Sequence, residues 1–212
     1  MSTFSIKHRQ DIDDLMADNN KLFTSSFENK IQYFDSNIMF SIMVRDAAKN
    51  QNKGDIELIS NMLGSINLIQ IDLLIIVYYT LNESRTLPKI YLARQAALLI
   101  YEALITLMKY RNSFYKTLNK HEFDIDFIHE LKTKSVENKD KLVMFENRVK
   151  KSIEDIRHFT AAHRDFDFEN QINAIKGADP NTMIGLSMEF DSIVQELSDI
   201  LKSYLDRYVI VN

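Results

Sequence analysis

The chain has 212 residues and a formal net charge of −4, and it contains no cysteine. This excludes disulfides, thiolate metal sites and a cysteine nucleophile, and argues against a surface that coats nucleic acid generally. With 45% hydrophobic residues but only 4 glycines and 2 prolines, the sequence predicts long helices in one all-α domain, residues 1–212.

The first 50 residues carry an amphipathic pattern. Apolar residues recur at spacings of three and four from position 10 to position 49, which predicts one long helix or a helix pair broken near Thr24–Ser26. We expect this N-terminal segment, residues 1–50, to pack on a bundle formed by residues 54–208.

The second predicted helix begins at Asp55, a residue type that favours the N-cap, and ends near Leu81. Its apolar run from Leu68 to Leu81 contains Gln70 and Asp72 and is shorter than the roughly 20 residues that a bilayer requires. We interpret it as a core helix and expect no membrane association. The start of the chain lacks a basic segment followed by an apolar stretch, which predicts a cytoplasmic protein.

A turn over Asn82–Pro88 precedes a third predicted helix, Lys89–Leu118, which is apolar on most faces. Such a helix is expected at the centre of a bundle. A polar connection follows over Asn119–Ser135, with a short helix at Asp124–Leu131.

A fourth long helix is predicted from about Val136, and Gly177–Pro180 separates it from a last helix, Asn181–Tyr208. The chain therefore reads as an up-and-down bundle of about five long helices. On the fourth helix, one apolar row has alternating spacings of three and four and consists of Leu142, Phe145, Val149, Ser152, Ile156, Phe159 and His163.

The segment from Arg157 to His163 pairs a fixed cation with a titratable imidazole. A guanidinium binds phosphate through paired hydrogen bonds, and imidazole moves protons near neutral pH. On an ideal helix the two residues lie about 120° apart with a rise of about 9 Å. A structural alternative makes His163 a helix-end imidazole and places Arg157 in a solvated ion pair with Glu154 or Asp155.

The segment Ile156–Asp165, which reads IRHFTAAHRD, resembles the motif of the HEPN superfamily. That motif is an arginine, four to six residues and a histidine, with a polar residue directly after the arginine. Here the gap is five and the polar residue is His158, where asparagine is commoner. The ending Ala162–Asp165, which reads AHRD, is similar to the abortive-infection type of HEPN-like protein.

The resemblance implies a HEPN-like helical bundle that forms a homodimer and cleaves RNA without a metal or other cofactor, as in toxin and abortive-infection systems. It implies that Arg157 holds the scissile phosphate and that His163 transfers a proton during attack by the RNA 2′-OH. By the same resemblance His158 orients the phosphate or assists proton transfer, and Asp165 supports the site. An antitoxin or regulatory protein is an expected partner besides RNA.

Two carboxylates, Asp72 and Glu102, lie within apolar stretches and are expected to be buried and paired. One interpretation pairs them structurally with a tyrosine hydroxyl or with an arginine of the bundle, the arginines being Arg85, Arg94 and Arg111. The other makes Glu102 a site residue that orients Arg157 or His163, and we prefer Glu102 to Asp72 for this role.

The densest basic cluster lies beside the motif, with Arg148 nearby, and its members Lys150, Lys151 and Arg164 are candidates to bind RNA phosphates. The alternative is a solvated helix face. Two carboxylate and histidine pairs, Asp155 with His158 and Asp126 with His129, loosely resemble those of di-metal helical bundles. Such a site also needs inward glutamates from two further helices, of which Glu102 could supply one, and aspartate substitutes poorly for glutamate at this spacing. A non-catalytic interaction protein, or a nucleotide-binding protein, remains the competing functional class.

Overall fold

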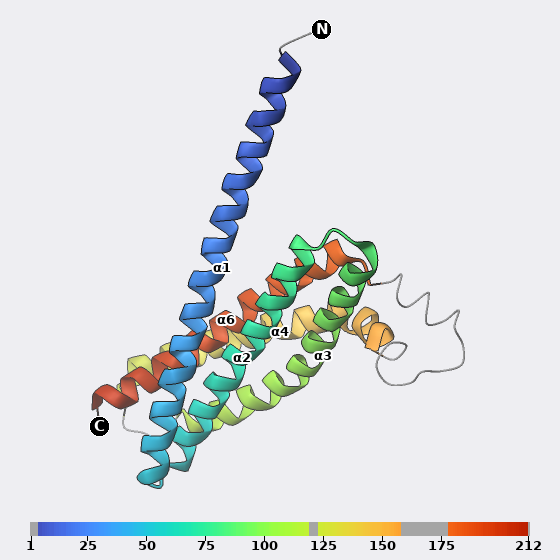
Figure 1. The fold of residues 1–212 in the computed structure, drawn as a ribbon. Coiled ribbons are helices and arrows are strands. Elements are labelled where there is room, and N and C mark those ends of the chain that lie inside the picture. Colours follow the sequence, from blue (N-terminus) through green and yellow to red (C-terminus); the bar gives the residue numbers. More distant parts are fainter. Residues whose placement is uncertain (1–3, 119–122, 158–177, 212) are drawn as a thin grey trace.

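The computed structural model describes residues 4–118, 123–157 and 178–211, with side chains described from Ser25 onward. Within these ranges the chain is an all-α helical bundle without strands, as predicted (Figure 1). Consecutive helices run in opposite directions (Figure 1). The helices are α1 (Phe4–Asn50), α2 (Gly54–Asn82), α3 (Thr86–Thr117), α4 (Ile125–Arg157) and α6 (Pro180–Val211).

Helix α1 is continuous over 47 residues, so the predicted alternative of a break near Thr24–Ser26 is wrong. Serine and threonine lower helix propensity only slightly, and the apolar pattern on both sides of them keeps one phase. The C-terminal half of α1 packs on α2, whereas its N-terminal half extends beyond the bundle (Figure 1).

The connection between α1 and α2 is a tight turn in which Asn52 adopts the left-handed region at φ 57°. Asparagine tolerates this conformation better than most residues. Helix α2 then begins at Gly54, so Asp55 is inside the first turn and is not the predicted N-cap. Its carboxylate still accepts a hydrogen bond from the Ile56 amide at 3.0 Å and lies where the helix dipole favours a negative charge.

Helix α4 is a single element from Ile125, so the predicted short helix at Asp124–Leu131 and the later start near Val136 are corrected. The predicted polar connection contains Ile128 and Leu131, which are buried and continue the apolar row of the helix. Asp124 caps the start by accepting a hydrogen bond from the Asp126 amide at 2.8 Å.

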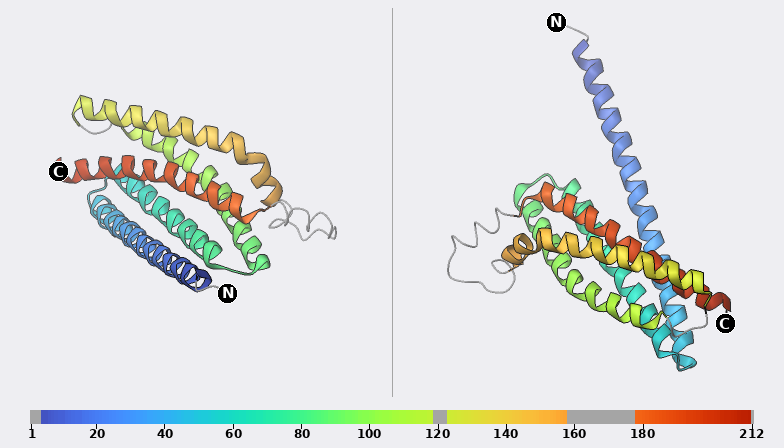
Figure 2. Two further views of the ribbon diagram at one scale, coloured as in Figure 1. Left: turned by 90° about the horizontal axis from the view of Figure 1, so that it is seen from above. Right: turned by 180° about the vertical axis from the view of Figure 1, so that it is seen from behind.

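Helices α2 and α6 occupy the middle of the bundle, with α1 and α4 on opposite sides of them (Figure 2). Helix α3 likewise packs on three helices, α2, α4 and α6, in keeping with its predicted central place, although Tyr91 and Ile105 are exposed. Its buried face contains four alanines, Ala93, Ala96, Ala97 and Ala103, which let neighbouring helices approach closely. The apolar residues of α3 are therefore divided between the faces that pack on these three helices and an exposed face.

Helices α2 and α3 are each long and apolar enough to cross a membrane, judged by length and composition alone. In each helix, 39% of the most apolar stretch of 18 residues is buried within the bundle. The core helix of a soluble protein passes the same test, so the sequence-based expectation that Leu68–Leu81 is a core helix stays a prediction.

A hydrogen-bonded polar group joins three helices inside this core. The fully buried Asn67 of α2 accepts a hydrogen bond from the Asn37 amide of α1 at 3.2 Å. Its own amide donates to the Leu63 carbonyl at 2.8 Å and to the Ser198 hydroxyl of α6 at 3.3 Å. Apolar packing tolerates sliding better than hydrogen bonds do, so this group sets the register of α1, α2 and α6.

We expect Asn67→Ala to destabilise the protein by about 2–4 kcal/mol, because the substitution leaves Asn37 and Ser198 without their partners in an apolar interior. Urea unfolding measures the change. The matched control is Asn82→Ala, in which an exposed side chain loses a hydrogen bond to the Tyr78 carbonyl of its own helix. Its expected cost is below about 0.5 kcal/mol. Equal costs for the two variants would contradict the register role.

Candidate functional site

Helix α4 presents one buried row to α3 and α6, and Arg157 follows directly on the last member of that row. The predicted row is confirmed at Leu142, Phe145, Val149 and Ile156, but Ile153 is buried where Ser152 was expected. Arg157 is four residues after Ile153 and therefore about 40° around the helix from it. This geometry places Arg157 at the edge of the buried row, on the side that meets α3.

The guanidinium of Arg157 is held by two adjacent residues of α3. Its Nε lies 3.4 Å from Glu102 Oε1. Its central carbon lies 4.6 Å from the centre of the Tyr101 ring, a cation–π contact. Among the described residues, no other side chain bonds its two η nitrogens. With respect to the described part of the chain, the fork of the guanidinium is thus available for a further anion.

The contact between Glu102 and Arg157 was one of the predicted alternatives, but the expected burial of Glu102 is wrong. The Glu102 side chain is 63% exposed and the Arg157 side chain is 42% exposed. Asp72 is exposed as well. Both carboxylates lie on outward faces of their helices, so neither requires a buried partner. A solvated pair contributes at most about 1 kcal/mol, and it can yield to a stronger anion.

The basic cluster on α4 is interleaved with carboxylates. Arg148 pairs with Glu189 of α6, and Lys150 lies 3.6 Å from Glu146 one turn earlier. Lys151 is exposed and forms no ion pair with another described residue. The described part of the cluster is therefore a solvated face whose exposed ion pairs cost little to exchange.

Four predicted site residues lie outside the described residues, namely His158, His163, Arg164 and Asp165. The predicted core residue Phe159 lies outside them too. What the structure brings together is Arg157 with Glu102 and Tyr101. Sequence reasoning missed Tyr101, and its only signal was its position beside Glu102.

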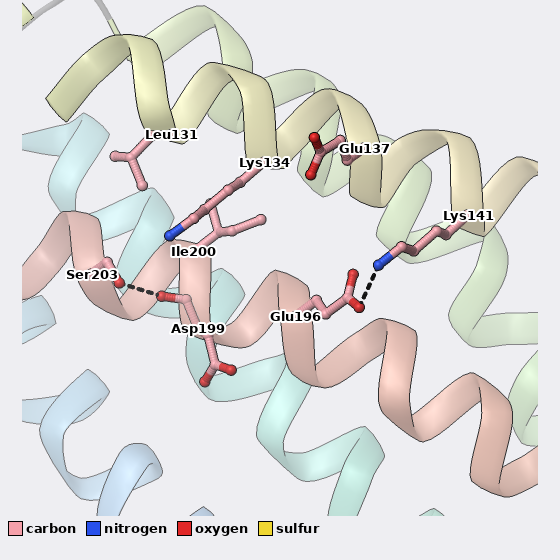
Figure 3. A pocket seen from close by; sticks show the side chains of 8 residues that line it. All are labelled: Leu131, Lys134, Glu137, Lys141, Glu196, Asp199, Ile200 and Ser203. Carbon is pink, nitrogen blue, oxygen red and sulfur yellow. Dashed lines mark hydrogen bonds and ion pairs between the residues drawn. The ribbon is translucent and has the colours of Figure 1, made fainter. Parts of the chain in front are cut away.

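A cavity of about 290 Å³ lies between α4 and α6 (Figure 3). Lys141 closes one end of it with an ion pair to Glu196 at 2.6 Å, and Ser203 donates to the Asp199 carbonyl at 2.7 Å. Lys134 and Glu137 also line it. Lys141 and Arg157 are 16 residues apart on one helix, or roughly 24 Å, so this cavity is separate from the arginine site. Because both lysines and carboxylates line this cavity, it favours neither an anionic nor a cationic ligand.

Within the described parts of α1 to α6 and their connections, no group of three histidine, aspartate or glutamate side chains is arranged to hold a metal ion. Asp126 and His129 are both exposed on the first turns of α4, so the spacing noted in the sequence does not gather further ligands within that part of the chain.

Comparison with known proteins identified no relative: no protein family, no curated protein and no solved structure matches the chain.

The arrangement at Arg157 predicts a measurable coupling. In a double-mutant cycle with Glu102→Gln and Arg157→Gln, we expect a coupling free energy of about 0.2–1 kcal/mol from urea unfolding. Tyr101→Leu is expected to remove about 0.5–1 kcal/mol of cation–π stabilisation in wild type and less in Arg157→Gln. Glu130 and Lys134, an exposed pair within α4, provide the control cycle. If the changes in unfolding free energy were strictly additive in the cycles of Arg157 with Glu102 and with Tyr101, neither residue would hold Arg157.

Proposed function

We propose that the protein is a metal-independent endoribonuclease of the HEPN type that acts in a toxin or abortive-infection system. The observation that supports this most directly is the state of Arg157. It lies on the packed helix α4 in contact with Glu102 and Tyr101, yet its side chain is 42% exposed. A positioned guanidinium that solvent reaches is what phosphate recognition requires.

In the proposed reaction Arg157 contacts the scissile phosphate through its η nitrogens and stabilises the charge that develops on it. The RNA 2′-oxygen attacks phosphorus, and the bond from phosphorus to the 5′-oxygen breaks. His163 takes part in the proton transfers, and His158 and Asp165 orient the reacting groups. The products are a 2′,3′-cyclic phosphate and a 5′-hydroxyl. Glu102 and Tyr101 act as positioning residues, because they hold the guanidinium from the side away from its fork.

The proposal assigns RNA backbone contacts to Lys150, Lys151 and Arg164. Single-stranded RNA would replace the exposed pair of Lys150 with Glu146, at little cost in free energy. Because the chain is acidic overall, affinity is expected to come from this local cluster and to fall with rising salt.

The proposal also includes a cytoplasmic homodimer that uses no cofactor, inserts into no membrane and is controlled by an antitoxin or regulatory protein. Exposed apolar side chains on α2 and α3, among them Leu68, Tyr79 and Tyr91, are compatible with a protein partner or a second copy. A monomeric mass by light scattering at micromolar concentration would count against a site shared by two chains.

A second candidate is a non-catalytic helical interaction protein, or a nucleotide-binding one. The specific observation in its favour is the N-terminal half of α1, which extends beyond the bundle as a helix (Figure 1). Helices without tertiary packing are marginal in water, so such an extension is typical of a segment that packs against a partner. In the nucleotide-binding version, Arg157 is required and His163 is dispensable.

Cleavage of RNA in excess EDTA tests the proposal. Wild-type protein is expected to cleave single-stranded RNA, and Arg157→Ala and His163→Ala are each expected to lower the rate by about 10²–10⁴-fold. Arg148→Ala is the matched control, because this arginine lies on the same helix in an ion pair with Glu189, and its rate should change little. Mass spectrometry of the new ends should find cyclic phosphates.

Two results would lead to rejection of the ribonuclease. One is the absence of cleavage of any RNA by folded wild-type protein. The other is cleavage that persists in both variants, which would point to a contaminating nuclease. Nucleotide binding that depends on Arg157 but not on His163 would support the second candidate.

A further inference from the structure

Arg111, near the C-terminal end of α3, is a partly buried cation without a countercharge at contact distance. Its Nε is buried and has no hydrogen-bond partner, and one η nitrogen donates to the Asn112 side chain at 3.0 Å. Burial lowers the pKa of Arg111, and the charge of Asp140 acts in the opposite direction from farther away. Asp140 forms no ion pair with it. This is the reverse of the situation at Arg157, which has a carboxylate beside it.

An arginine that is taken out of water without a carboxylate is unfavourable, and proteins pair or ligate such groups. The surroundings of Arg111 add positive charge. It lines a cavity of about 470 Å³ between α3 and α4, together with Lys116 and Lys139. Neither lysine forms an ion pair with another described residue. By contrast Lys134, Lys141 and Arg148, elsewhere on α4, are each paired with a glutamate.

The polar groups of the cavity suit a phosphate. Its lining also includes Asn112, Tyr115 and the buried Ser135, which provide neutral hydrogen-bonding groups beside three cations. A planar guanidinium with two ammonium groups matches the several oxygens of a tetrahedral phosphate, whether it carries two charges as in a nucleotide or one as in an RNA backbone, better than a single carboxylate. A helix dipole explains cations in the last turn of α3, where Lys116 lies. It does not explain the buried Nε of Arg111, five residues earlier.

We propose that the cavity lined by Arg111, Lys116 and Lys139 is a binding site for a phosphate group, carried by a free nucleotide or by the backbone of an RNA. Its volume is within the range of small-ligand sites. Lys139 and Arg157 are 18 residues apart on α4, or about 27 Å, so this site is distinct from the proposed catalytic arginine. The inference does not depend on the ribonuclease proposal.

The test is a titration of ¹⁵N-labelled protein followed at the arginine Nε–H signals by NMR. The probes are inorganic phosphate, AMP and a short 2′-O-methyl RNA, which lacks the 2′-hydroxyl needed for cleavage. Sodium chloride at equal ionic strength controls for screening. The variants are Arg111→Gln and Arg111→Lys, with Arg148→Gln as the matched surface control. Because the two Arg111 variants lack the Arg111 signal, their binding is measured from the rise in melting temperature with probe concentration.

At least one phosphate probe is expected to shift the Arg111 signal saturably and to raise the melting temperature of wild type. Arg111→Gln should weaken that binding roughly 10- to 100-fold and Arg111→Lys by less, as expected for loss of charge-assisted hydrogen bonds. Arg148→Gln should bind like wild type. Tighter binding of AMP than of phosphate and RNA identifies a nucleotide site, and tighter binding of the RNA identifies a backbone site.

The proposal is overturned if no probe moves the Arg111 signal, or if sodium chloride moves it equally. It is also overturned if Arg148→Gln weakens binding as much as Arg111→Gln does. Should Arg111→Gln fail to fold, the comparison of Arg111→Lys with wild type decides. In that comparison, unchanged affinity for every probe counts against the site.

Discussion

The buried row of α4 is the constraint on which the candidate site depends. From Ile128 to Ile156 the helix presents one apolar face to α3 and α6, and the tilted rings of Phe145 and Phe190 meet with centroids 5.4 Å apart. Each fully buried side chain of this size contributes about 1.5–3 kcal/mol, so rotation of α4 about its axis would be costly. The direction of Arg157 is set by this packing, and the weak surface pair with Glu102 only refines it.

The described structure contains arginines in contrasting electrostatic environments. Arg157 is solvated and lies beside Glu102 and Tyr101, a combination that fixes its direction without neutralising it in a dry interior. Arg111 is partly buried, with no carboxylate in contact. At Arg157 a carboxylate already contacts Nε, and an incoming phosphate would meet the η nitrogens beside it, whereas at Arg111 a phosphate would supply a missing countercharge.

The sequence was sufficient to predict the all-α class of the fold. Glycine and proline are scarce, and apolar residues recur at spacings of three and four, so few alternatives to long helices remain. The prediction failed where an apolar run was equated with burial. Glu102 and Ile105 sit in such runs and are exposed, because they lie on the outward face of α3. The start of α4 was predicted too late in the chain, because the many polar residues of the predicted connection drew attention away from the two apolar residues Ile128 and Leu131, which continue the buried row.

The site was predictable in part. The residue types around Arg157 singled it out, and Glu102 was named as a partner from its position alone. Tyr101 and Arg111 were not predicted as site residues. The cation–π contact of Tyr101 and the missing countercharge of Arg111 both depend on which faces of the helices pack together. Those faces are set by packing between elements that are distant in sequence, and a single sequence does not encode them in any local pattern.

Chemical rescue of RNA cleavage tests the central claim most directly, that the Arg157 guanidinium and the His163 imidazole perform separate steps on one phosphate. Cleavage by Arg157→Ala would be measured with millimolar guanidinium, and cleavage by His163→Ala with imidazole. We expect guanidinium to restore activity only to Arg157→Ala, and imidazole only to His163→Ala. If neither small molecule restores activity to its own variant, or if either restores both variants equally, the assigned roles are contradicted.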